Sequence, residues 1–499
     1  MSYPDSLVCK DYLELNPENA SFKDLFHLLF FNNRKSFIVS PSEFEQDLRK
    51  FNYRWLVVTS VVLLKLLRIM KKPLKYIGFF IITWMNLITN YGGVLKLLLN
   101  FIKGNVTMPN ESSDTNRSMI ALLDRRVDLD PKIEPGHVNY EGSFTWMAAK
   151  LSYENSAFIK TIVEDNWKME LVGAYDFRND FQGSNSTHAF MVRNKSKDKD
   201  TIVVAFKGTN PFDADDCSAD IDISWFRLTN VGKVHGGFMK ALGLQNTKDG
   251  VGWPKDIESS DEKPQFAYYK IRQVLRNIIQ ENKDAKFVVA GHSLGGALAI
   301  LFASVLILHD EKELLDRLEG VYTFGQPRVG DEQFGDFMKK NLKAYNVKYC
   351  RYVYCNDMVP RVPFDDKTLL FEHFGPCLYY DSFYRGRELK EEPNKNYLSL
   401  VWVITKYMNA GWELIRGIVL PRLKWGPDYK ECWCQIIYRV FGLIIPGLSA
   451  HGPQDYTNLT RLGRMALPRN HDKKKKMSLI QIIRKTLAQI NCTRISHTS

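Results

Sequence analysis

The sequence predicts an α/β fold in which helices cover both faces of a mostly parallel sheet. Short apolar runs with the composition of buried strands lie at residues 201–206, 286–290, 320–325 and 348–355. Between them, residues 266–283 and 294–318 show the apolar spacing of helices. Short apolar strands that alternate with helices are typical of a parallel sheet that is buried on both sides.

Length and charge narrow the class of protein. With 499 residues, the chain is long enough for one large core with appendages or for two domains. Its formal charge of +12 favours a polyanionic partner, either nucleic acid or an anionic membrane surface. We favour the membrane surface and expect no nucleic acid, because the sequence has no zinc-ligand spacing and no recognition-helix signature. The densest basic run, Lys473–Lys476, lies in a polar tail at 469–499 that we expect to be solvated.

Cysteine usage and the start of the chain indicate a reducing compartment. The eight cysteines have neither the spacing of a zinc site nor that of a redox pair, so we expect no disulfide framework. The first twenty residues are polar and acidic without an apolar centre, unlike a secretory signal peptide. We therefore expect a location that faces the cytosol.

The N-terminal region, residues 1–135, contains two apolar segments at 55–67 and 76–102. The first is too short to cross a bilayer, which takes about 20 residues, whereas residues 76–95 carry no charge over that length. Because a basic stretch joins the two segments, we expect a hairpin that lies on or dips into a lipid surface. The alternatives are a single bilayer span and a pair of buried core helices. The polar residues 104–135 are predicted to be a linker without packing of their own.

Residues 136–468 are predicted to form the domain that contains the sheet, and they include an insertion at 378–446. Within the insertion, residues 397–420 and 432–448 are long apolar and aromatic runs between basic residues such as Arg416. This composition favours amphiphilic helices rather than further strands.

The sequence Gly-His-Ser-Leu-Gly at residues 291–295 fits the Gly-x-Ser-x-Gly pattern of a nucleophile elbow. A predicted strand precedes it and a predicted helix follows it, as such a turn requires. The glycines leave room for a sharp bend that raises the hydroxyl of Ser293 above the sheet. At the start of the helix, the backbone N–H of Leu294 can point at developing negative charge. Ser293 is therefore the candidate nucleophile.

A serine nucleophile needs a base and an orienting carboxylate, which follow it in the order acid, then histidine, in folds with this elbow. Asp357 comes just after a predicted strand and before a proline-rich loop, where the acid belongs, whereas its rival Asp331 is placed to cap a helix. His451, in a loop ahead of a short helical stretch, is the candidate base. Its rival is His373, for which the alternative role is that of a buried structural histidine.

A second donor for the oxyanion is expected from an early strand. The apolar run at 203–206 leads into Lys207-Gly208-Thr209, where the N–H and the hydroxyl of Thr209 are both expected to face the site. The sequence Val-His-Gly-Gly-Phe at 234–238 is similar to the His-Gly-Gly loop of some esterases and is the weaker candidate.

Together these motifs resemble the class 3 (fungal-type) triacylglycerol lipases, and within them the plant oil-body lipases. The matching sequences are VVAFKGTN, VHGGFMKAL, VVAGHSLGGALA, YTFGQPRVGD, NDMVPRVP and HGPQDYTN, in this order, over about residues 140–375 and 445–468. The resemblance implies an α/β-hydrolase fold, a Ser293–Asp357–His451 triad, and oxyanion donors at Thr209 and Leu294. It also implies a lid after Thr209. The insertion departs from the small secreted members, which place few residues between acid and base.

The stretch at 210–228 fits such a lid. It holds five aspartates followed by Trp225 and Phe226, and it lacks the glycine of a calcium loop. We expect the acidic strip to face water and the two aromatic rings to face the closed site, so that opening at an oil surface exposes them. The alternative is an ordinary surface loop.

The sequence thus predicts an enzyme, a lipase that hydrolyses acyl esters of triacylglycerol through an acyl-enzyme at a lipid droplet surface, without metal or cofactor. The alternative substrates are phospholipid (as in a phospholipase A1), diacylglycerol and galactolipid. The non-enzymatic alternative is a lipid-surface protein that has kept an inactive hydrolase fold. The expected partners are the lipid substrate and a droplet monolayer or membrane surface. A homo-oligomer and a location at the endoplasmic reticulum membrane are left open.

Overall fold

The structure, a computed structural model, describes residues 6–9, 11–31, 37–39, 50–195, 199–247, 250–257, 265–363, 371–395, 397 and 403–465. The chain divides into two units, Met1–Arg464 and Met465–Ser499. The fold and the site presented below lie in the first unit. The predicted basic tail, residues 469–499, lies outside the described residues.

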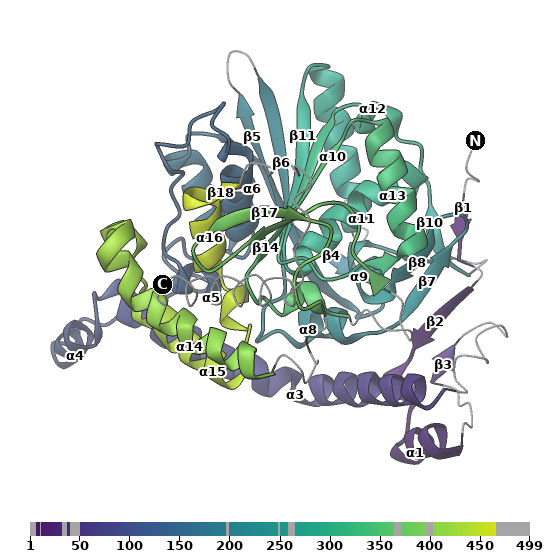
Figure 1. Cartoon of the computed structure of the whole chain (residues 1–499), viewed down its shortest axis with the longest axis horizontal. Helices are drawn as coiled ribbons and strands as arrows, with labels where there is room; N and C mark the ends of the chain where they lie inside the picture. The colour runs from purple at the N-terminus through teal and green to yellow at the C-terminus, as the bar shows by residue number, and fades with distance from the viewer. Residues whose placement is uncertain are drawn as a thin grey trace, which may run out of the picture. The chain divides into compact units, whose positions relative to one another are not determined.

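A sheet with a parallel centre forms the middle of the first unit (Figure 1). The strands that lie wholly in the first unit have the order β17-β16-β14-β12-β11-β6-β5-β4. The five strands from β16 to β6 run parallel to one another, whereas β17, β5 and β4 pair antiparallel at the two ends. The bounds are β4 (Glu170–Asn179), β5 (Ser184–Lys195), β6 (Asp200–Phe206), β11 (Lys286–His292), β12 (Leu318–Phe324), β14 (Lys348–Tyr354), β16 (Cys377–Tyr380) and β17 (Arg385–Leu389). This arrangement confirms the predicted α/β class and the α/β-hydrolase fold.

Helices cover both faces of the sheet because side chains alternate along each strand. Val204 and Phe206 of β6 belong to a core formed with α9, α10, α11 and α13, while Val203 and Ala205 belong to a core formed with α6, α7 and α16. The two groups of helices lie on opposite sides of the sheet in Figure 1. The bounds are α6 (Tyr140–Leu151), α7 (Ser156–Lys160), α9 (Gly236–Leu242), α10 (Ala267–Glu281), α11 (Leu294–Leu308), α12 (Lys312–Leu315), α13 (Glu332–Ala344) and α16 (Pro453–Leu462).

The helix predicted over residues 294–318 is shorter than expected. α11 ends at Leu308, and Asp310 takes a positive φ of 53° that a helix cannot continue through. The short α12 follows, and β12 already begins at Leu318. The apolar spacing continues in the sequence beyond Leu308 because α12 also buries leucines.

A second sheet joins the start of the chain to the body of the protein. Its order is β15-β13-β8-β7-β2-β3, and β2 (Asp11–Leu15) pairs antiparallel with β7 (Trp225–Leu228). The other bounds are β3 (Ile38–Val39), β8 (Gly232–His235), β13 (Gly330–Asp331) and β15 (Phe371–Glu372). A third sheet has the order β1-β10-β9, with bounds β1 (Ser6–Val8), β9 (Gln245–Thr247) and β10 (Gly250–Pro254).

The two apolar arms expected to form a hairpin belong largely to one helix, so that expectation is wrong. α3 (Phe51–Asn90) continues for 40 residues, which corresponds to about 60 Å. The basic stretch between the arms stays helical because lysine, arginine, leucine and methionine are strong helix formers, and only Pro73 interrupts the hydrogen bonds. α1 (Phe22–Phe31) precedes α3, and α4 (Val94–Ile102) follows it. Across the described part of the chain, no helix combines the length and the apolar composition that crossing a bilayer requires.

The predicted linker at 104–135 packs in part against the body. It contains α5 (Met119–Leu123), whose residues Leu122 and Leu123 are buried in a cluster with Met85 and Cys434. The next residue, Asp124, is buried and forms an ion pair of 3.1 Å with Lys150 of α6. An apolar run of five residues is too short to show helical spacing, so this contact could not be predicted from local pattern.

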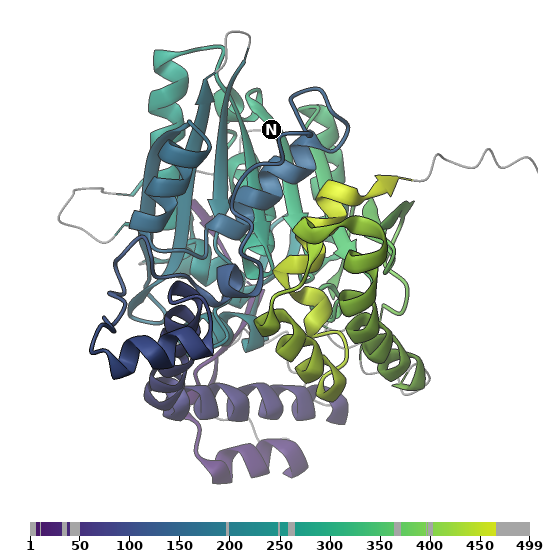
Figure 2. The ribbon, with the colours of Figure 1, turned by 90° about the vertical axis from the view of Figure 1, so that its left-hand side faces the viewer.

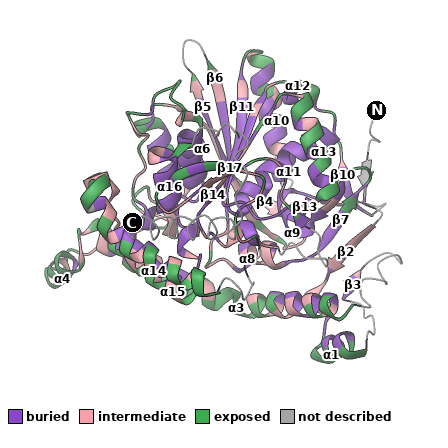
Figure 3. Cartoon of the chain, viewed as in Figure 1, coloured by how far each residue is buried: buried purple, intermediate pink, exposed green. Residues whose placement is uncertain are grey.

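The insertion also differs from the prediction of helices alone. Residues 378–389 extend the main sheet through β16 and β17, and only then do α14 (Val403–Leu420) and α15 (Trp433–Ile444) follow. Exposed residues gather on the outer sides of α3, α14 and α15 (Figure 3), and many of them are large apolar residues. Arg416, expected to be a basic flank, is instead fully buried.

Candidate active site

Ser293 lies on the sharp turn between β11 and α11. Its backbone angles, φ 59° and ψ −130°, are ones that residues other than glycine rarely adopt. The backbone N–H of Ser293 donates to the carbonyl of Phe324, at 2.9 Å. The residue is only 6% exposed. The turn therefore holds the serine in a fixed, strained and covered position.

The two glycines of the elbow are required by close approach. A Cβ on Gly291 would lie 2.1 Å from the carbonyl carbon of Gly295, and a Cβ on Gly295 would lie 2.2 Å from the carbonyl oxygen of Phe206. Both distances are far below any real contact. Thus β6, β11 and α11 meet this tightly only because neither position carries a side chain.

Asp357 and His451 are in direct contact. Nδ1 of His451 lies 2.8 Å from Oδ2 and 3.0 Å from Oδ1 of Asp357. The hydroxyl of Tyr456 donates to Oδ2 at 2.6 Å, and the N–H of Val359 donates to Oδ1 at 2.9 Å. Because the Asp357 side chain is fully buried, these donors replace the water that would otherwise stabilise its charge.

Gly325 allows this pair to approach the elbow. A Cβ there would lie 2.7 Å from Oδ2 of Asp357 and 2.8 Å from Cε1 of His451. Phe324, which accepts the hydrogen bond from the Ser293 backbone, is the preceding residue. The rings of His292 and His451 also stack, with centroids 4.3 Å apart. The acid and the imidazole therefore lie beside the serine.

The outer nitrogen of this imidazole is available for proton transfer. Nε2 of His451 is buried and has no hydrogen-bond partner among the described residues, so the Ser293 hydroxyl is not bonded to it in this conformation. Since the carboxylate contacts Nδ1, the neutral ring carries its proton there and keeps a lone pair on Nε2. Such an imidazole can take a proton from a neighbouring hydroxyl, and catalytic hydrogen bonds often tighten only when substrate is bound.

His292 contacts the turn that carries His451 and stacks on the His451 ring. Its Nε2 donates to the backbone carbonyl of His451 at 3.1 Å, and its Nδ1 accepts from the hydroxyl of Tyr153 at 2.9 Å. Burial, together with the nearby His451, lowers the pKa of His292 well below its ordinary value. The ring is therefore neutral, and it links the residue before the serine to the turn that carries His451.

Thr209 and Leu294 lie on the two sides of the elbow. Thr209 follows β6, and its hydroxyl donates to Oδ2 of Asp220 at 2.6 Å. The preceding Gly208 is packed so closely that a Cβ would lie 2.4 Å from the carbonyl oxygen of His292. Leu294 is the first residue of α11, where backbone N–H groups have no partner within the helix. The residue before Thr209 thus packs on the elbow, and Leu294 directly follows the serine.

Asp220 is a second carboxyl group near the imidazole. It lies on α8 (Ala214–Ile221), and it is partly buried. Burial raises the pKa of Asp220 to about 6, against the opposing effects of the Thr209 hydrogen bond and of His451. The segment after Thr209 therefore lies close to both Thr209 and His451.

The rival residues lie elsewhere. His373 is buried, and its Nε2 donates to the carbonyl of Pro360 at 2.7 Å, as expected for a structural histidine. Asp331 caps α13 by accepting from the N–H of Phe334 at 2.9 Å. His235, in the Val-His-Gly-Gly-Phe sequence, is buried and stacks on Phe238 with centroids 4.0 Å apart.

The lid expectation needs a correction at its aromatic end. Trp225 and Phe226 are buried in β7, paired between β2 and β8, so they belong to a sheet and do not face the serine as part of a cover. Strand pairing with the N-terminal β2 could not be foreseen from the local sequence. The helical part of the stretch is α8, which begins after its cap Asp213 and carries Asp220.

α3 lies against α8 along the end of the sheet (Figures 1 and 2). The hydroxyl of Ser60 donates to the carbonyl of Ile221 at 2.8 Å, and Lys71 forms an ion pair of 2.8 Å with Asp215. At Gly78, a Cβ would lie 2.4 Å from the Cβ of Phe212, just before α8. The long helix therefore contacts α8 near both of its ends and the residue Phe212 before it.

The sequence analysis assigned no role to several residues of the site. Tyr456, Gly325 and His292 each lie inside a quoted motif, but their partners come from distant parts of the chain. In the sequence, the signal that could have identified them was their place within the same motifs as the predicted triad. Asp220 was one of five similar aspartates, so its contact with Thr209 could not be singled out.

Comparison with known proteins assigns the chain to a family. A family model described as Lipase (class 3) matches residues 203–367. Triacylglycerol lipase OBL1 of Arabidopsis thaliana is 40% identical over 492 residues, which covers 91% of this chain and 95% of that protein. The protein of the same name from Nicotiana tabacum is 39% identical and covers 83% of this chain and 84% of its own length. The one from Ricinus communis is 36% identical, with 93% and 97% covered. The chain therefore belongs to the class 3 lipase family.

Proposed function

We propose that this protein hydrolyses acyl ester bonds of triacylglycerol, with Ser293 as nucleophile, His451 as base and Asp357 as the orienting acid. The observation that carries the proposal is the Asp357–His451 contact of 2.8 Å beside a serine on a strained elbow. Similarity along most of the chain to proteins named triacylglycerol lipase supports the substrate class.

In the first step, the Ser293 oxygen attacks the ester carbonyl while its proton passes to Nε2 of His451. The buried Asp357 carboxylate stabilises the imidazolium that forms. The N–H groups of Thr209 and Leu294 receive the negative charge of the tetrahedral intermediate, and loss of one such donor typically lowers turnover by a factor of about 100 or more. Collapse of the intermediate releases the diacylglycerol alcohol, which takes the proton from His451.

In the second step, water attacks the acyl-Ser293 ester. His451 takes the proton of the water and then returns it to the Ser293 oxygen as the fatty acid leaves. Each proton that leaves an attacking group thus passes to a leaving group, and the enzyme returns to its starting state. The residues named above suffice for this cycle.

We infer that α8 is the cover of the site. Ser293 is 6% exposed, and the α8 residue Asp220 is bonded to Thr209, which supports a closed conformation. Access for a triacylglycerol then requires α8 to move, and α3 lies against both ends of its segment. A lipid surface that binds α3 would favour this movement.

We further propose that the enzyme works at the surface of a lipid droplet. Large apolar residues are exposed on three helices: Ile69, Tyr76 and Phe80 on α3, Ile404 and Met408 on α14, and Phe441 and Ile444 on α15. Exposed apolar surface of this extent is typical of proteins that bind membranes or partners. The formal charge of +12 suits an anionic phospholipid layer, and the resemblance to plant oil-body lipases favours the droplet.

The test is the release of oleate from emulsified trioleoylglycerol by the purified full-length chain and by its Ser293→Ala variant. We expect hydrolysis by the wild type and its loss in the variant at unchanged fold. Equal hydrolysis by both would exclude the proposed nucleophile. The wild type could instead leave trioleoylglycerol intact and rapidly cleave a phospholipid, diacylglycerol or galactolipid offered in the same mixture. That result would show a different substrate for the same mechanism.

A further inference from the structure

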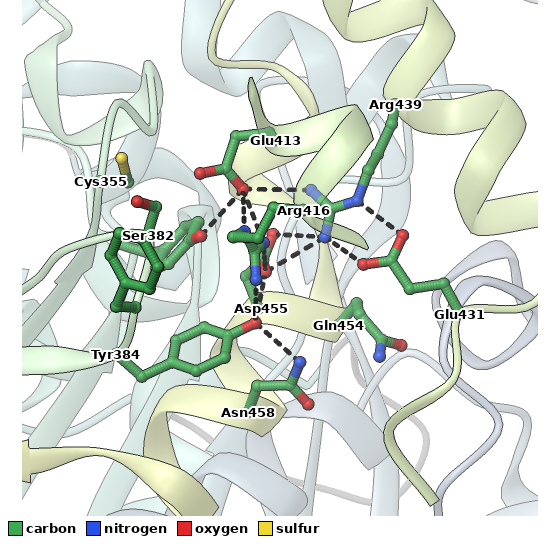
Figure 4. Close-up of polar contacts among 12 residues, drawn as sticks. Cys355, Ser382, Tyr384, Glu413, Arg416, Glu431, Arg439, Gln454, Asp455 and Asn458 are labelled. Carbon is green, nitrogen blue, oxygen red and sulfur yellow. Dashed lines mark hydrogen bonds and ion pairs between the residues drawn. The ribbon is translucent and has the colours of Figure 1, made fainter. Parts of the chain in front are cut away.

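The insertion between acid and base is joined to the helix that follows His451 by a buried group of charges (Figure 4). Arg416 comes from α14, Arg439 from α15 and Asp455 from α16, and the side chains of all three are fully buried. Nη2 of Arg416 lies 2.6 Å from Oδ1 of Asp455, and Nη2 of Arg439 lies 3.2 Å from Oδ2. Two guanidinium groups from the insertion therefore hold one carboxylate on α16.

Further polar groups fix the two arginines. Arg439 forms a two-bond pair with Glu431, at 2.6 and 2.5 Å. Glu413 accepts from Arg416 at 2.6 Å and from the hydroxyl of Tyr354 at 2.9 Å. Tyr354 is the last residue of β14, three positions before Asp357. The group of charges thus contacts the strand that leads to the acid as well as the helix behind the base.

Asp455 lies close to the catalytic groups in the chain. It follows His451 by four residues and directly precedes Tyr456, whose hydroxyl donates to Asp357 at 2.6 Å. Burial opposes the ionisation of Asp455, and the charges of Arg439 and Arg416 outweigh it, so that its pKa lies below the ordinary value. A charged Asp455 is therefore held between two cations, and any shift of α16 would move both His451 and Tyr456.

Stability alone does not account for this arrangement. Buried ion pairs are costly to desolvate, and well-packed apolar residues of similar volume often stabilise a protein as well or better. What charged groups add is a single position, because a carboxylate paired with two fixed guanidinium groups tolerates little displacement. A base that must meet a serine from another part of the fold needs such a fixed position.

We propose that Asp455 is a positioning residue of the active site, which Arg416 and Arg439 of the insertion hold in place so that α16 presents His451 to Ser293. The proposal rests on the proposed function, in which His451 is the base. Asp455 itself touches no reacting atom. The insertion then has a role in catalysis besides exposing apolar helices, because the same two helices fix the position of the base.

Two variants of the full-length chain test the proposal: Asp455→Asn, which removes the charge, and Arg416→Lys, which keeps a charge but loses the forked guanidinium. The matched control is Glu311→Gln. Glu311 is likewise a buried carboxylate held by two guanidinium groups, those of Arg272 at 3.1 Å and Arg276 at 2.5 Å, and it lies between α11 and α12. For each protein the measurements are the unfolding temperature, kcat and KM for a dissolved short-chain ester, and the rate of Ser293 labelling by a fluorophosphonate.

We expect Asp455→Asn and Arg416→Lys to lower kcat and the labelling rate by roughly tenfold to a hundredfold with little change in KM, since misplacing a catalytic group by about 1 Å has effects of this size. Glu311→Gln should lower the unfolding temperature and leave kcat and the labelling rate unchanged. Wild-type kcat in a folded Asp455 or Arg416 variant, or an equal loss in Glu311→Gln, would overturn the proposal. If Asp455→Asn does not fold, Arg416→Lys decides. Failure of the wild type to be labelled at Ser293 would instead refute the proposed function.

Discussion

Nδ1 of His451 lies 2.8 Å from Oδ2 of Asp357, although 94 residues separate the two in the chain. Most of the intervening chain is the insertion, which leaves the sheet after β17 and forms α14 and α15 before the chain reaches His451. The same carboxylate oxygen accepts from Tyr456, five residues beyond His451. The acid and the base are thus assembled by tertiary structure, and contacts within the insertion determine whether they meet.

Removal of the Tyr456 hydroxyl should impair the acid without unfolding the protein. In Tyr456→Phe, the buried Asp357 loses one of its donors, at 2.6 Å, and a hydrogen bond to a charged group contributes about 1.5–3 kcal/mol. We expect kcat to fall by about tenfold or more at unchanged KM, measured with a dissolved short-chain ester. Tyr140→Phe, which alters a half-buried tyrosine on α6, serves as the control. An unchanged kcat would show that the hydroxyl does not support the acid.

Enlarging Gly78 should open the cover without a lipid surface. In Gly78→Leu, the new side chain collides with Phe212 and separates α3 from the segment of α8. If the substitution destabilises the closed state by about 1 kcal/mol, the population of the open state rises about fivefold. The measurement is the rate on a dissolved ester relative to the rate on an emulsion, which should increase by about that factor.

Gly411→Leu is the matched control for this prediction, because a Cβ at Gly411 meets no atom within 4 Å. It lies on α14, away from the contact between α3 and α8. If Gly78→Leu folds and its rate ratio equals that of the wild type, α3 does not hold the cover closed.

Charges on the exposed apolar face of α15 should weaken binding to droplets. Phe441 and Ile444 are 55% and 68% exposed, and full burial of such a side chain contributes about 1.5–3 kcal/mol. The variant with Phe441→Asp and Ile444→Asp should bind phospholipid-coated oil droplets at least about tenfold more weakly, in a flotation assay. Its rate on a dissolved ester should not change.

Lys283→Asp controls for net charge, since it makes the same change of two units at an exposed residue at the end of α10. Equal weakening in Lys283→Asp would mean that charge alone attracts the protein to the droplet. Unaltered binding of the α15 variant would show that this face does not contact the lipid layer.

Two aspartates of α8 should make the protein less stable as the pH rises. Burial raises the pKa values of Asp216 and Asp220 to about 6, above the ordinary value of 3.8. Between these values the folded chain holds protons that the unfolded chain has lost, so the free energy of unfolding falls as the pH rises from about 4 to 6 and then levels off. Each group contributes up to about 3 kcal/mol to this fall.

Urea unfolding across this pH range checks the prediction. Asp216→Asn and Asp220→Asn should each flatten the decline. Asp222→Asn is the control with the opposite sign: burial works against its charge, but Lys240 and further partners keep the pKa of Asp222 below its ordinary value. That variant should lose stability at neutral pH. An unchanged slope in both Asp216→Asn and Asp220→Asn would contradict the account.

The parts of the fold and site that the sequence predicted are those governed by local pattern. Each of these patterns is contiguous in the chain: the glycines around Ser293, and the apolar runs of β6, β11, β12 and β14. Their structure could therefore be predicted without knowledge of distant residues. The choice of Asp357 over Asp331 followed from the place of Asp357 after a predicted strand and before a proline-rich loop, and from the helix cap that Asp331 provides. The Asp357–His451 contact agrees with that choice of residues.

The parts that the sequence did not predict depend on distant partners. Arg416 and Arg439 resembled flanking basic residues, because burial of a charge becomes acceptable only once its carboxylate partner is known. α16 is polar along most of its length and yet buried, so it shows no apolar stripe. The hairpin expected at α3 failed for a local reason, since a basic stretch rich in helix formers continues a helix as readily as it ends one.

The most direct test of the central claim is to map the adduct that a fluorophosphonate forms on the full-length protein by mass spectrometry of its peptides. We predict a single adduct on Ser293, absent from Ser293→Ala and formed far more slowly by His451→Ala. An unlabelled Ser293 in the folded wild type, or equal labelling of the His451 variant, would contradict the claim that this serine is a nucleophile activated by this histidine.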